Sequence, residues 1–259
     1  MIYKQVDFNN NEGLPVLTFY KAKKKTSEWT ILIFPGGGYE KHSKYEGEEY
    51  AHFLNKNGFD AFVLNYRIYP DLFPAPLLDA RRAIQYIRHN KEKFELNHNK
   101  IAVMGSSAGG HLAALVSNYK EHINDGINDE ISNEDYLPNA QILCYPVIRL
   151  TSDFTHVGSQ INLLGKENLS MAQKLSVDSL VTDKTPPAFI WHTFSDNIVS
   201  VLNSLSYATE LKKYAVRTEI HIFHDGGHGL GLANDDETDP VLSHISQWSD
   251  LLVNWLKYL

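Results

Sequence analysis

Ile101-Ala102-Val103-Met104-Gly105-Ser106-Ser107-Ala108-Gly109-Gly110-His111-Leu112-Ala113-Ala114-Leu115 combines the signals of a strand, a tight turn and a helix in one short stretch. Residues 101–104 are an apolar run, which is typical of a strand that is covered on both faces in a parallel sheet. After the turn, small and apolar residues recur at helical spacing at Ala108, Leu112, Leu115 and Val116. The turn is therefore expected at the carboxyl end of a strand and the amino end of a helix.

Residues 105–109 fit the pattern G-x-S-x-G, with Ser107 in the nucleophile position. A strand that turns into a helix within a few residues crowds its neighbours, so glycines beside the serine relieve the turn. The helix N-terminus would favour negative charge that develops near Ser107. Small-residue turns are common, and a serine that only caps the helix is the alternative. The strand before the motif and the helix after it favour a catalytic serine.

Working outward, strand patterns alternate with helix patterns along the chain. Two extended stretches within residues 2–20 are separated by the polar turn 9–13, and the other strands are expected at 29–34, 60–66, 141–145, 188–193 and 219–223. Helices are expected at 43–57, 77–87, 202–211 and 245–256. This alternation predicts an α/β fold, with a mostly parallel sheet of about eight strands and helices on both faces. We expect a single domain over residues 1–259.

Two polar segments interrupt the pattern and are expected to be surface insertions, at residues 120–138 and 149–185. The second contains a short helical pattern near residues 169–175. Because both follow strands, they could build the rim of a site. Arg81, Arg82 and Arg88 lie off the apolar face of the helix at 77–87 and are expected to face solvent.

The composition excludes several classes of partner. The 259 residues include 31 acidic and 24 basic side chains, giving a net charge of −7 without a basic stripe, so nucleic acid is not an expected partner. No run of eighteen apolar residues and no leader pattern at Met1 are present, so we expect no membrane contact. The single cysteine, Cys144, lies in an apolar run and is expected to be buried in a protein of the reducing cytoplasm.

Three glycines follow the strand at 29–34 in the stretch Pro35-Gly36-Gly37-Gly38-Tyr39. Consecutive glycines leave backbone N–H groups open to close approach by a ligand. A phosphate-binding loop is not expected, because no Gly-Lys-Ser/Thr follows. We expect the N–H groups of Gly37 and Gly38, together with that of Ala108, to form an oxyanion hole.

Asp196 follows the strand at 188–193, and His228 lies in the glycine-rich loop after the strand at 219–223. Sites in open α/β sheets form beyond the carboxyl ends of strands, where these residues and Ser107 all lie. Ester hydrolysis through an acyl-enzyme needs a nucleophile, a base and a group that orients the base. Ser107, His228 and Asp196 would fill these roles, in the chain order Ser-Asp-His that α/β-hydrolases use.

At this point the chain resembles the α/β-hydrolase superfamily, and more narrowly its acetyl esterase and acetylxylan esterase-like members, which are related to the hormone-sensitive-lipase branch. The matching stretches run from about residue 30 to residue 232: Pro35–Tyr39, Glu46–Glu48, Asn65–Arg67, Pro74–Asp79, Gly105–Ala113, Asp196 with Val199, and His228–Leu230. The resemblance implies Ser107 as nucleophile, Asp196 as triad acid and His228 as base, with no cofactor.

The chain departs from these relatives in three places. Ser200 stands where the relatives often have proline, and His224-Asp225 replaces a proline-containing approach to the histidine. Pro35 stands where hormone-sensitive-lipase relatives have histidine. Those relatives also carry an N-terminal cap, whereas only about thirty residues precede the first matched strand here. No large N-terminal cap is therefore expected.

Several residues have a second interpretation. Tyr39 is taken as a substrate-binding residue, with packing under the glycine loop as the alternative. His221, His224 and His228 suggest a metal cluster by spacing, but strand alternation would point the first two to opposite faces, so no metal site is expected. Three loop aspartates near the base are rivals of Asp196 for the acid: Asp225, Asp235 and Asp236.

The sequence thus predicts a serine esterase that removes short acyl groups, acetyl above all, from a small-molecule ester. Acetylated xylo-oligosaccharides are implied as substrates by the resemblance alone. The same triad would serve an amide hydrolase, either a peptidase or an arylformamidase, and a non-catalytic binding protein is a third class. The acyl-chain limit and the oligomeric state, homodimer included, stay open at this stage.

Overall fold

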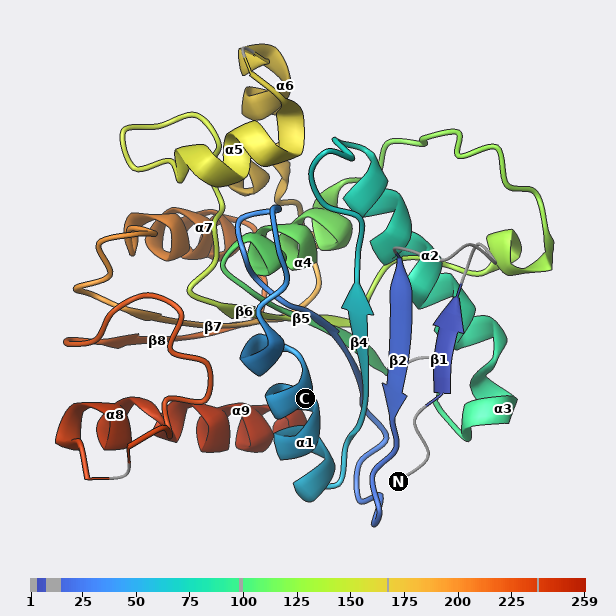
Figure 1. The fold of residues 1–259 in the computed structure, drawn as a ribbon, viewed down its shortest axis with the longest axis horizontal. Helices are drawn as coiled ribbons and strands as arrows, with labels where there is room; N and C mark the ends of the chain where they lie inside the picture. Colours follow the sequence, from blue (N-terminus) through green and yellow to red (C-terminus); the bar gives the residue numbers. More distant parts are fainter. Residues whose placement is uncertain (1–3, 8–14, 98–99, 167, 237) are drawn as a thin grey trace.

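Eight strands form one sheet in the order β1-β2-β4-β3-β5-β6-β7-β8 in the computed structural model, which describes residues 4–7, 15–97, 100–166, 168–236 and 238–259 (Figure 1). The strands are β1 (Lys4–Asp7), β2 (Val16–Tyr20), β3 (Thr30–Phe34), β4 (Asp60–Asn65), β5 (Ile101–Ser106), β6 (Ala140–Cys144), β7 (Ala188–Thr193) and β8 (Thr218–Phe223). Neighbouring strands from β4 to β8 pair in parallel, whereas β2 pairs antiparallel with both β4 and β1.

The expected α/β fold with a mostly parallel sheet is confirmed. Strands β2 to β8 make a central sheet of seven strands, and the four-residue β1 adds an eighth at its edge. The antiparallel pairing of β1 with β2 agrees with the two extended stretches expected near the start of the chain. The expected turn at residues 9–13 lies outside the described residues.

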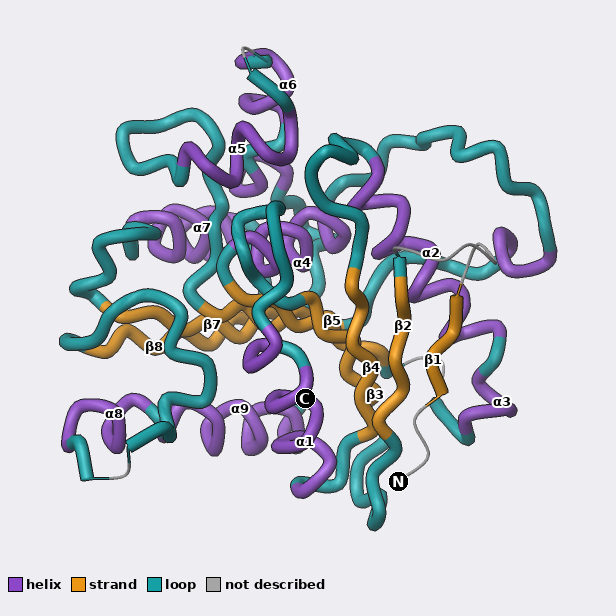
Figure 2. Tube along the Cα trace, viewed as in Figure 1, coloured by secondary structure: helices purple, strands orange, loops and turns teal. Residues whose placement is uncertain are grey.

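Helices cover both faces of the sheet, with α1, α8 and α9 on one side and α2, α4 and α7 on the other (Figures 1 and 2). The α-helices are α1 (Glu48–Lys56), α2 (Ala75–His89), α3 (Lys91–Phe94), α4 (Ala108–Asn118), α5 (Val157–Leu164), α6 (Leu169–Lys174), α7 (Leu202–Lys213), α8 (Pro240–Ile245) and α9 (Gln247–Tyr258). The described residues also contain three 3₁₀-helices, η1 (Lys44–Glu46), η2 (Glu130–Asn133) and η3 (Val177–Leu180). Each face has its own apolar cluster, so the central strands are buried on both sides.

Two helices expected to be continuous are divided. The segment expected at 43–57 is η1 followed by α1, with Gly47 between them. A Cβ on Gly47 would lie 3.1 Å from side-chain carbons of both Pro35 and Val63. The backbone at Gly47 therefore passes close to Val63 of β4. The last helix, expected at 245–256, is α8 followed by α9, with Ser246 between them.

The insertion at 120–138 packs against α2, which corrects the expected role of two arginines. Arg81 donates to the carbonyl oxygens of Tyr119 and Glu121, at 2.6 and 3.1 Å, and Arg88 donates to that of Leu137 at 2.7 Å. Both arginines are buried. The prediction that they face solvent was wrong, because the helix pattern cannot show that a later segment covers the polar side of α2.

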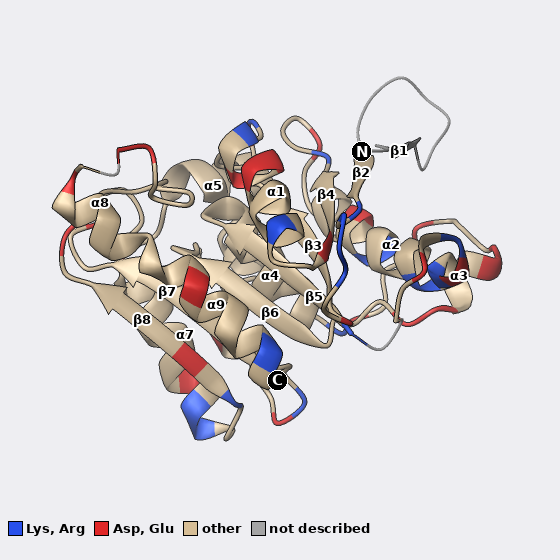
Figure 3. Ribbon diagram, turned by 90° about the horizontal axis from the view of Figure 1, so that it is seen from below, with Lys and Arg blue, Asp and Glu red and all other residues tan. Residues whose placement is uncertain are grey.

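Most charged residues lie on the helices and loops, and β5, β6 and β7 contain no Asp, Glu, Lys or Arg (Figure 3). Acidic and basic residues are mixed on most of these surfaces. Within the described residues, no helix is both long and apolar enough to cross a membrane.

Candidate active site

Ser107 lies in the turn between β5 and α4, with a backbone φ of 53°. With a ψ of −118°, this positive-φ conformation is uncommon for residues other than glycine and is often found at functional sites. A Cβ on Gly105 would lie 2.0 Å from the carbonyl oxygen of Gly109, and one on Gly109 would lie 2.1 Å from that of Phe34. Both motif glycines are therefore required by backbone contacts. The turn places the Ser107 hydroxyl beyond the carboxyl end of β5.

His228 connects Ser107 to Asp196. Its Nε2 lies 2.9 Å from Ser107 Oγ, and its Nδ1 lies 2.7 Å from Asp196 Oδ2. An ionised carboxylate can only accept, so Nδ1–H donates to Asp196 and Nε2 is left to accept the hydroxyl proton of Ser107. The structure thus brings together the three residues that the sequence placed after β5, β7 and β8. This is the geometry that a nucleophile, its base and an orienting acid require.

Asp196 is held by hydrogen bonds on both oxygens. Oδ1 accepts from the N–H groups of Ile198 and Val199 at 2.9 Å each, and Oδ2 lies 3.3 Å from His192 Nε2. Burial by itself would raise the pKa of Asp196, but the bonds from His192 and His228 and the charge of His228 outweigh it and hold the pKa below its usual range. The residue is therefore a carboxylate at neutral pH.

The glycine loop after β3 lies beside the serine turn, since a Cβ on Gly36 would lie 3.2 Å from Ser107 Cβ. Within the part of the chain that the structure describes, the N–H groups of Gly37 and Gly38 have no acceptor. The N–H of Ala108 belongs to the first turn of α4, where intrahelical acceptors are lacking. A Cβ on Gly37 would lie 2.2 Å from the carbonyl oxygen of Lys41, and its φ is 124°, so this position requires glycine. Such N–H groups can stabilise a developing oxyanion.

Helix α5, from the insertion at 149–185, lies against this loop. Asn162 Nδ2 donates to the carbonyl oxygen of Gly38 at 2.9 Å. At the start of the helix, His156 Nδ1 accepts from the N–H of Ser159 at 3.2 Å, so its proton lies on Nε2. Burial and the charge of His228 lower the pKa of His156, which is neutral at pH 7. The insertion at 149–185 therefore contacts the glycine loop, whereas the insertion at 120–138 packs on α2.

Tyr39 does not line an open surface. Its side chain is fully buried, and its hydroxyl lies 2.8 Å from Nδ1 of His111, which is on α4. The alternative raised by the sequence, packing under the glycine loop, describes this position. Tyr39 is therefore a packing residue beneath the loop and has no exposed surface for a substrate to contact.

Sequence reasoning missed a buried carboxylate below the site. Glu46 accepts from the N–H of Gly36 at 2.9 Å and from the hydroxyl of Tyr145 at 2.8 Å. The only sequence feature that pointed to Glu46 was its position in Glu46–Glu48, one of the stretches that resemble the family. Asn162 and His156 had no signal at all, because helix α5 was not expected.

The rival residues lie apart from this arrangement. Asp225 pairs with the exposed His224 at 2.9 Å, and Asp235 and Asp236 are exposed. No group of three potential metal ligands occurs among the described residues. Cys144 is buried as expected, and burial raises the pKa of its thiol to about 12.

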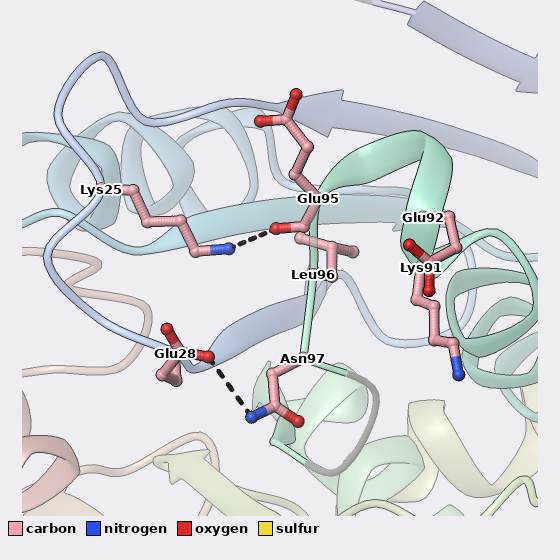
Figure 4. Close-up of a pocket in the computed structure, with 7 residues that line it drawn as sticks. All are labelled: Lys25, Glu28, Lys91, Glu92, Glu95, Leu96 and Asn97. Atoms are coloured by element: carbon pink, nitrogen blue, oxygen red, sulfur yellow. Dashed lines mark hydrogen bonds between the residues drawn. The ribbon is translucent and has the colours of Figure 1, made fainter.

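A separate hollow of about 530 Å³ lies between the β2–β3 connection and the segment around α3 (Figure 4). It contains Lys25 and Glu28, which precede β3, and Lys91 and Glu95 from the region before β5. Lys25 Nζ donates to the carbonyl oxygen of Glu95 across it at 2.8 Å. These residues lie at the amino ends of the parallel strands, so the hollow is at the opposite edge of the sheet from Ser107.

The chain is similar to two curated proteins over most of its length. It is 35% identical over 246 residues to endo-1,4-beta-xylanase B of Butyrivibrio fibrisolvens, a match that covers 91% of this chain and 38% of the relative. It is 31% identical over 233 residues to an acetylxylan esterase of Xylanibacter ruminicola, covering 88% of this chain and 45% of the relative. The chain thus spans less than half the length of these relatives.

Solved structures extend the similarity to nearly the whole chain. An acetyl ester-xyloside bifunctional hydrolase from Caldicellulosiruptor lactoaceticus is 41% identical, with a TM-score of 0.86 and coverage of 96% of this chain and 89% of that one. A carboxylesterase from Lactobacillus plantarum WCFS1 is 26% identical, with a TM-score of 0.82 and coverage of 100% and 98%. The model of the BD-FAE family matches residues 17–211. These matches agree with the parallel sheet and the serine turn, and they show that the chain belongs to the BD-FAE family within the α/β-hydrolase superfamily.

Proposed function

We propose that this protein is a serine esterase that hydrolyses esters of short acyl groups, acetyl above all. The observation that carries the proposal is the continuous hydrogen-bonded path from Ser107 Oγ through His228 to Asp196, which begins at a serine with a positive φ in a tight turn. The names of the relatives support the choice of acetyl esters. Residues 1–259 would act as one catalytic domain that works in the cytoplasm and requires no cofactor.

In the proposed reaction, Ser107 Oγ attacks the ester carbonyl carbon while His228 Nε2 takes the hydroxyl proton. The carbonyl oxygen becomes an oxyanion that accepts from the N–H groups of Gly37, Gly38 and Ala108. When the tetrahedral intermediate collapses, the C–O bond to the alcohol breaks and the alcohol leaves with the proton from His228. Water then attacks the acyl-serine in the same way, with His228 again as base, and releases the acid.

We further propose acetylated xylo-oligosaccharides as the substrate class. The support is the similarity to an acetylxylan esterase and to an acetyl ester-xyloside hydrolase. Helix α5 also brings a polar side chain, His156, to the rim beside Gly38, where a Cβ on that glycine would lie 4.0 Å from the imidazole. An Nε2–H group at this place could donate to a sugar hydroxyl.

The test compares wild type with Ser107→Ala on p-nitrophenyl acetate, butyrate and octanoate, and on acetylated xylo-oligosaccharides. We expect the wild type to prefer acetate and to release acetate from the sugar, and the variant to lose about 10⁶-fold in kcat. Near-wild-type rates for the variant would rule out Ser107 as nucleophile. Serine-dependent cleavage of N-formylkynurenine or of aminopeptidase substrates that exceeds cleavage of every ester would replace the esterase proposal with an amide hydrolase.

A further inference from the structure

Glu46 is an almost fully buried acid at the end of η1, with 2% of its surface exposed. Oε2 accepts from the N–H of Gly36 at 2.9 Å, and Oε1 accepts from the hydroxyl of Tyr145 at 2.8 Å. Among the residues that the structure describes, no lysine or arginine forms an ion pair with it. Burial of a carboxylate is costly, so a residue that only filled space here would be better replaced by an apolar one.

Tyr145 extends this contact to the other loops of the site. Its hydroxyl accepts from the N–H of Gly231, in the loop that carries His228, at 3.0 Å. It also lies 3.2 Å from the hydroxyl of Tyr50, which accepts from Ser106 Oγ at 3.2 Å, one residue before the nucleophile. One buried network therefore reaches the oxyanion loop after β3, the serine turn after β5 and the histidine loop after β8.

Glu46 also lies close enough to His228 to interact with its charge. Burial raises the pKa of Glu46, while the bonds from Tyr145 and Gly36 and the positive charge of His228 lower it. The other titratable groups that interact with Glu46 stay neutral near pH 7, because burial raises each pKa: Tyr45, Tyr50, Tyr66, Cys144 and Tyr145. His228 is thus the group of this set that becomes positively charged during the proposed reaction.

We infer that Glu46 is a positioning residue of the proposed esterase, whose carboxylate holds the oxyanion loop and the histidine loop in place and stabilises the imidazolium of His228. The inference rests on the proposed function, because it needs an oxyanion at Gly37 and Gly38 and a base at His228. Glu46 touches neither substrate nor the reacting atoms. It acts through Gly36 and Tyr145, and through its charge.

The pH profile separates this role from a purely structural one. The groups that face His228 are Asp196, Ser107, the ring of Tyr145 at 5.1 Å, His156 and Glu46. A negative charge on Glu46 attracts the positive charge that His228 carries when it has taken a proton. Removal of the Glu46 charge is therefore expected to move the acidic limb of kcat/KM to lower pH.

The experiment measures kcat and KM of the full chain for p-nitrophenyl acetate from pH 4.5 to 9 in wild type, Glu46→Gln and Glu48→Gln. Glu48 is a matched control, because it lies two residues away with an exposed side chain. We expect kcat of Glu46→Gln to fall about 10- to 100-fold with a small change in KM, and its acidic limb to move to lower pH. Glu48→Gln should retain the wild-type profile. An unshifted limb in a folded Glu46→Gln variant would overturn the inference.

Tyr145→Phe provides a second test, since it removes the hydroxyl that joins Glu46 to Gly231 and keeps the aromatic packing. Circular dichroism and thermal unfolding report whether each variant folds. We expect folded Tyr145→Phe to lose at least about fivefold in kcat. A wild-type kcat in this variant overturns the inference, and so does failure of both variants to fold, because the network would then be a folding element.

Failure of the inference differs from failure of the proposed function. If the wild type neither hydrolyses esters nor reacts with a fluorophosphonate probe at Ser107, the proposed function fails and the inference falls with it. If the wild type is active and Ser107→Ala is not, while Glu46→Gln matches wild type at every pH, the inference alone fails.

Discussion

Asp196 Oδ1 accepts from the backbone N–H groups of Ile198 and Val199, and these two hydrogen bonds fix the carboxylate in one orientation. That orientation decides which nitrogen of His228 carries the proton. In Asp196→Asn, the Oδ1 position would keep the amide oxygen, because two N–H groups donate to it, and the NH₂ group would face Nδ1. Nε2 would then be protonated and could not accept from Ser107.

Asp196→Asn is therefore expected to lower kcat roughly 10³- to 10⁴-fold with p-nitrophenyl acetate, while the fold is retained. Asp225→Asn is the matched control, because Asp225 is one of the rival acids and bonds only to the exposed His224 within the described residues. It should keep nearly wild-type activity. The opposite result, a large loss in Asp225→Asn and a small one in Asp196→Asn, would reassign the acid.

At this scale, the sequence predicted the residues that follow strands and missed those that act through distant contacts. Ser107 stands in a local motif, and Asp196 and His228 follow recognisable strands. Glu46 was missed because the contact that places it in the network comes from Tyr145, 99 positions later. No local pattern contains such a pair, so the buried network could not have been predicted from periodicity.

At the scale of elements, the amino end of α4 packs directly on the backbone where β3 ends. A Cβ on Gly109 would lie 2.1 Å from the carbonyl oxygen of Phe34, and backbone atoms cannot move aside as a flexible side chain can. Gly109→Ala is expected to lower the free energy of unfolding by about 3 kcal/mol or more. Urea denaturation gives the measurement.

Gly227→Ala serves as its control, because a Cβ at Gly227 would have no atom within 4 Å. Its free energy of unfolding should stay within about 1 kcal/mol of wild type, the ordinary effect of a Gly-to-Ala change. Equal stability of the two variants would mean that α4 and β3 can separate more easily than the structure indicates.

Helices were predicted well where one apolar face packs on the sheet, as in α4 and α7. They were predicted poorly where contacts with other segments determine whether a helix forms and where it ends. The segment at 43–57 is divided because Gly47 approaches Pro35 and Val63 closely. Helix α5 was missed because it is short and lies within a polar insertion, where its cap by His156 is not a recognised signal. Tertiary contacts, and not propensity, determine these elements.

For the whole molecule, buried histidines make stability depend on pH. His111 is fully buried. Its Nε2–H donates to the carbonyl oxygen of Leu175 at 2.9 Å, so its Nδ1 carries no proton and accepts from the hydroxyl of Tyr39. Burial lowers its pKa to about 4, and that of His42 is also lowered to about 4. Between about pH 6.5 and pH 4 the unfolded chain binds more protons than the folded one, so the free energy of unfolding decreases as pH falls.

His111 alone is expected to account for a loss of about 3 kcal/mol between pH 7 and pH 4. Urea denaturation across this range should show a shallower pH dependence for His111→Gln than for wild type. His224→Gln, at an exposed position, should leave the slope unchanged. Parallel curves for His111→Gln and wild type would show that His111 becomes protonated in the folded protein.

The separation of Ser107 from His228 has a consequence for the protein during its synthesis. The two residues are 121 positions apart, and the ribosome adds roughly 5–20 residues per second, so the proposed base is made about 6–24 seconds after the proposed nucleophile. Throughout this interval the growing chain holds a serine hydroxyl without its base. If Ser107 and His228 act as proposed, a nascent chain is expected to be inert toward esters and toward fluorophosphonates until β8 and the loop after it have been added, so reactivity would report that synthesis has passed His228.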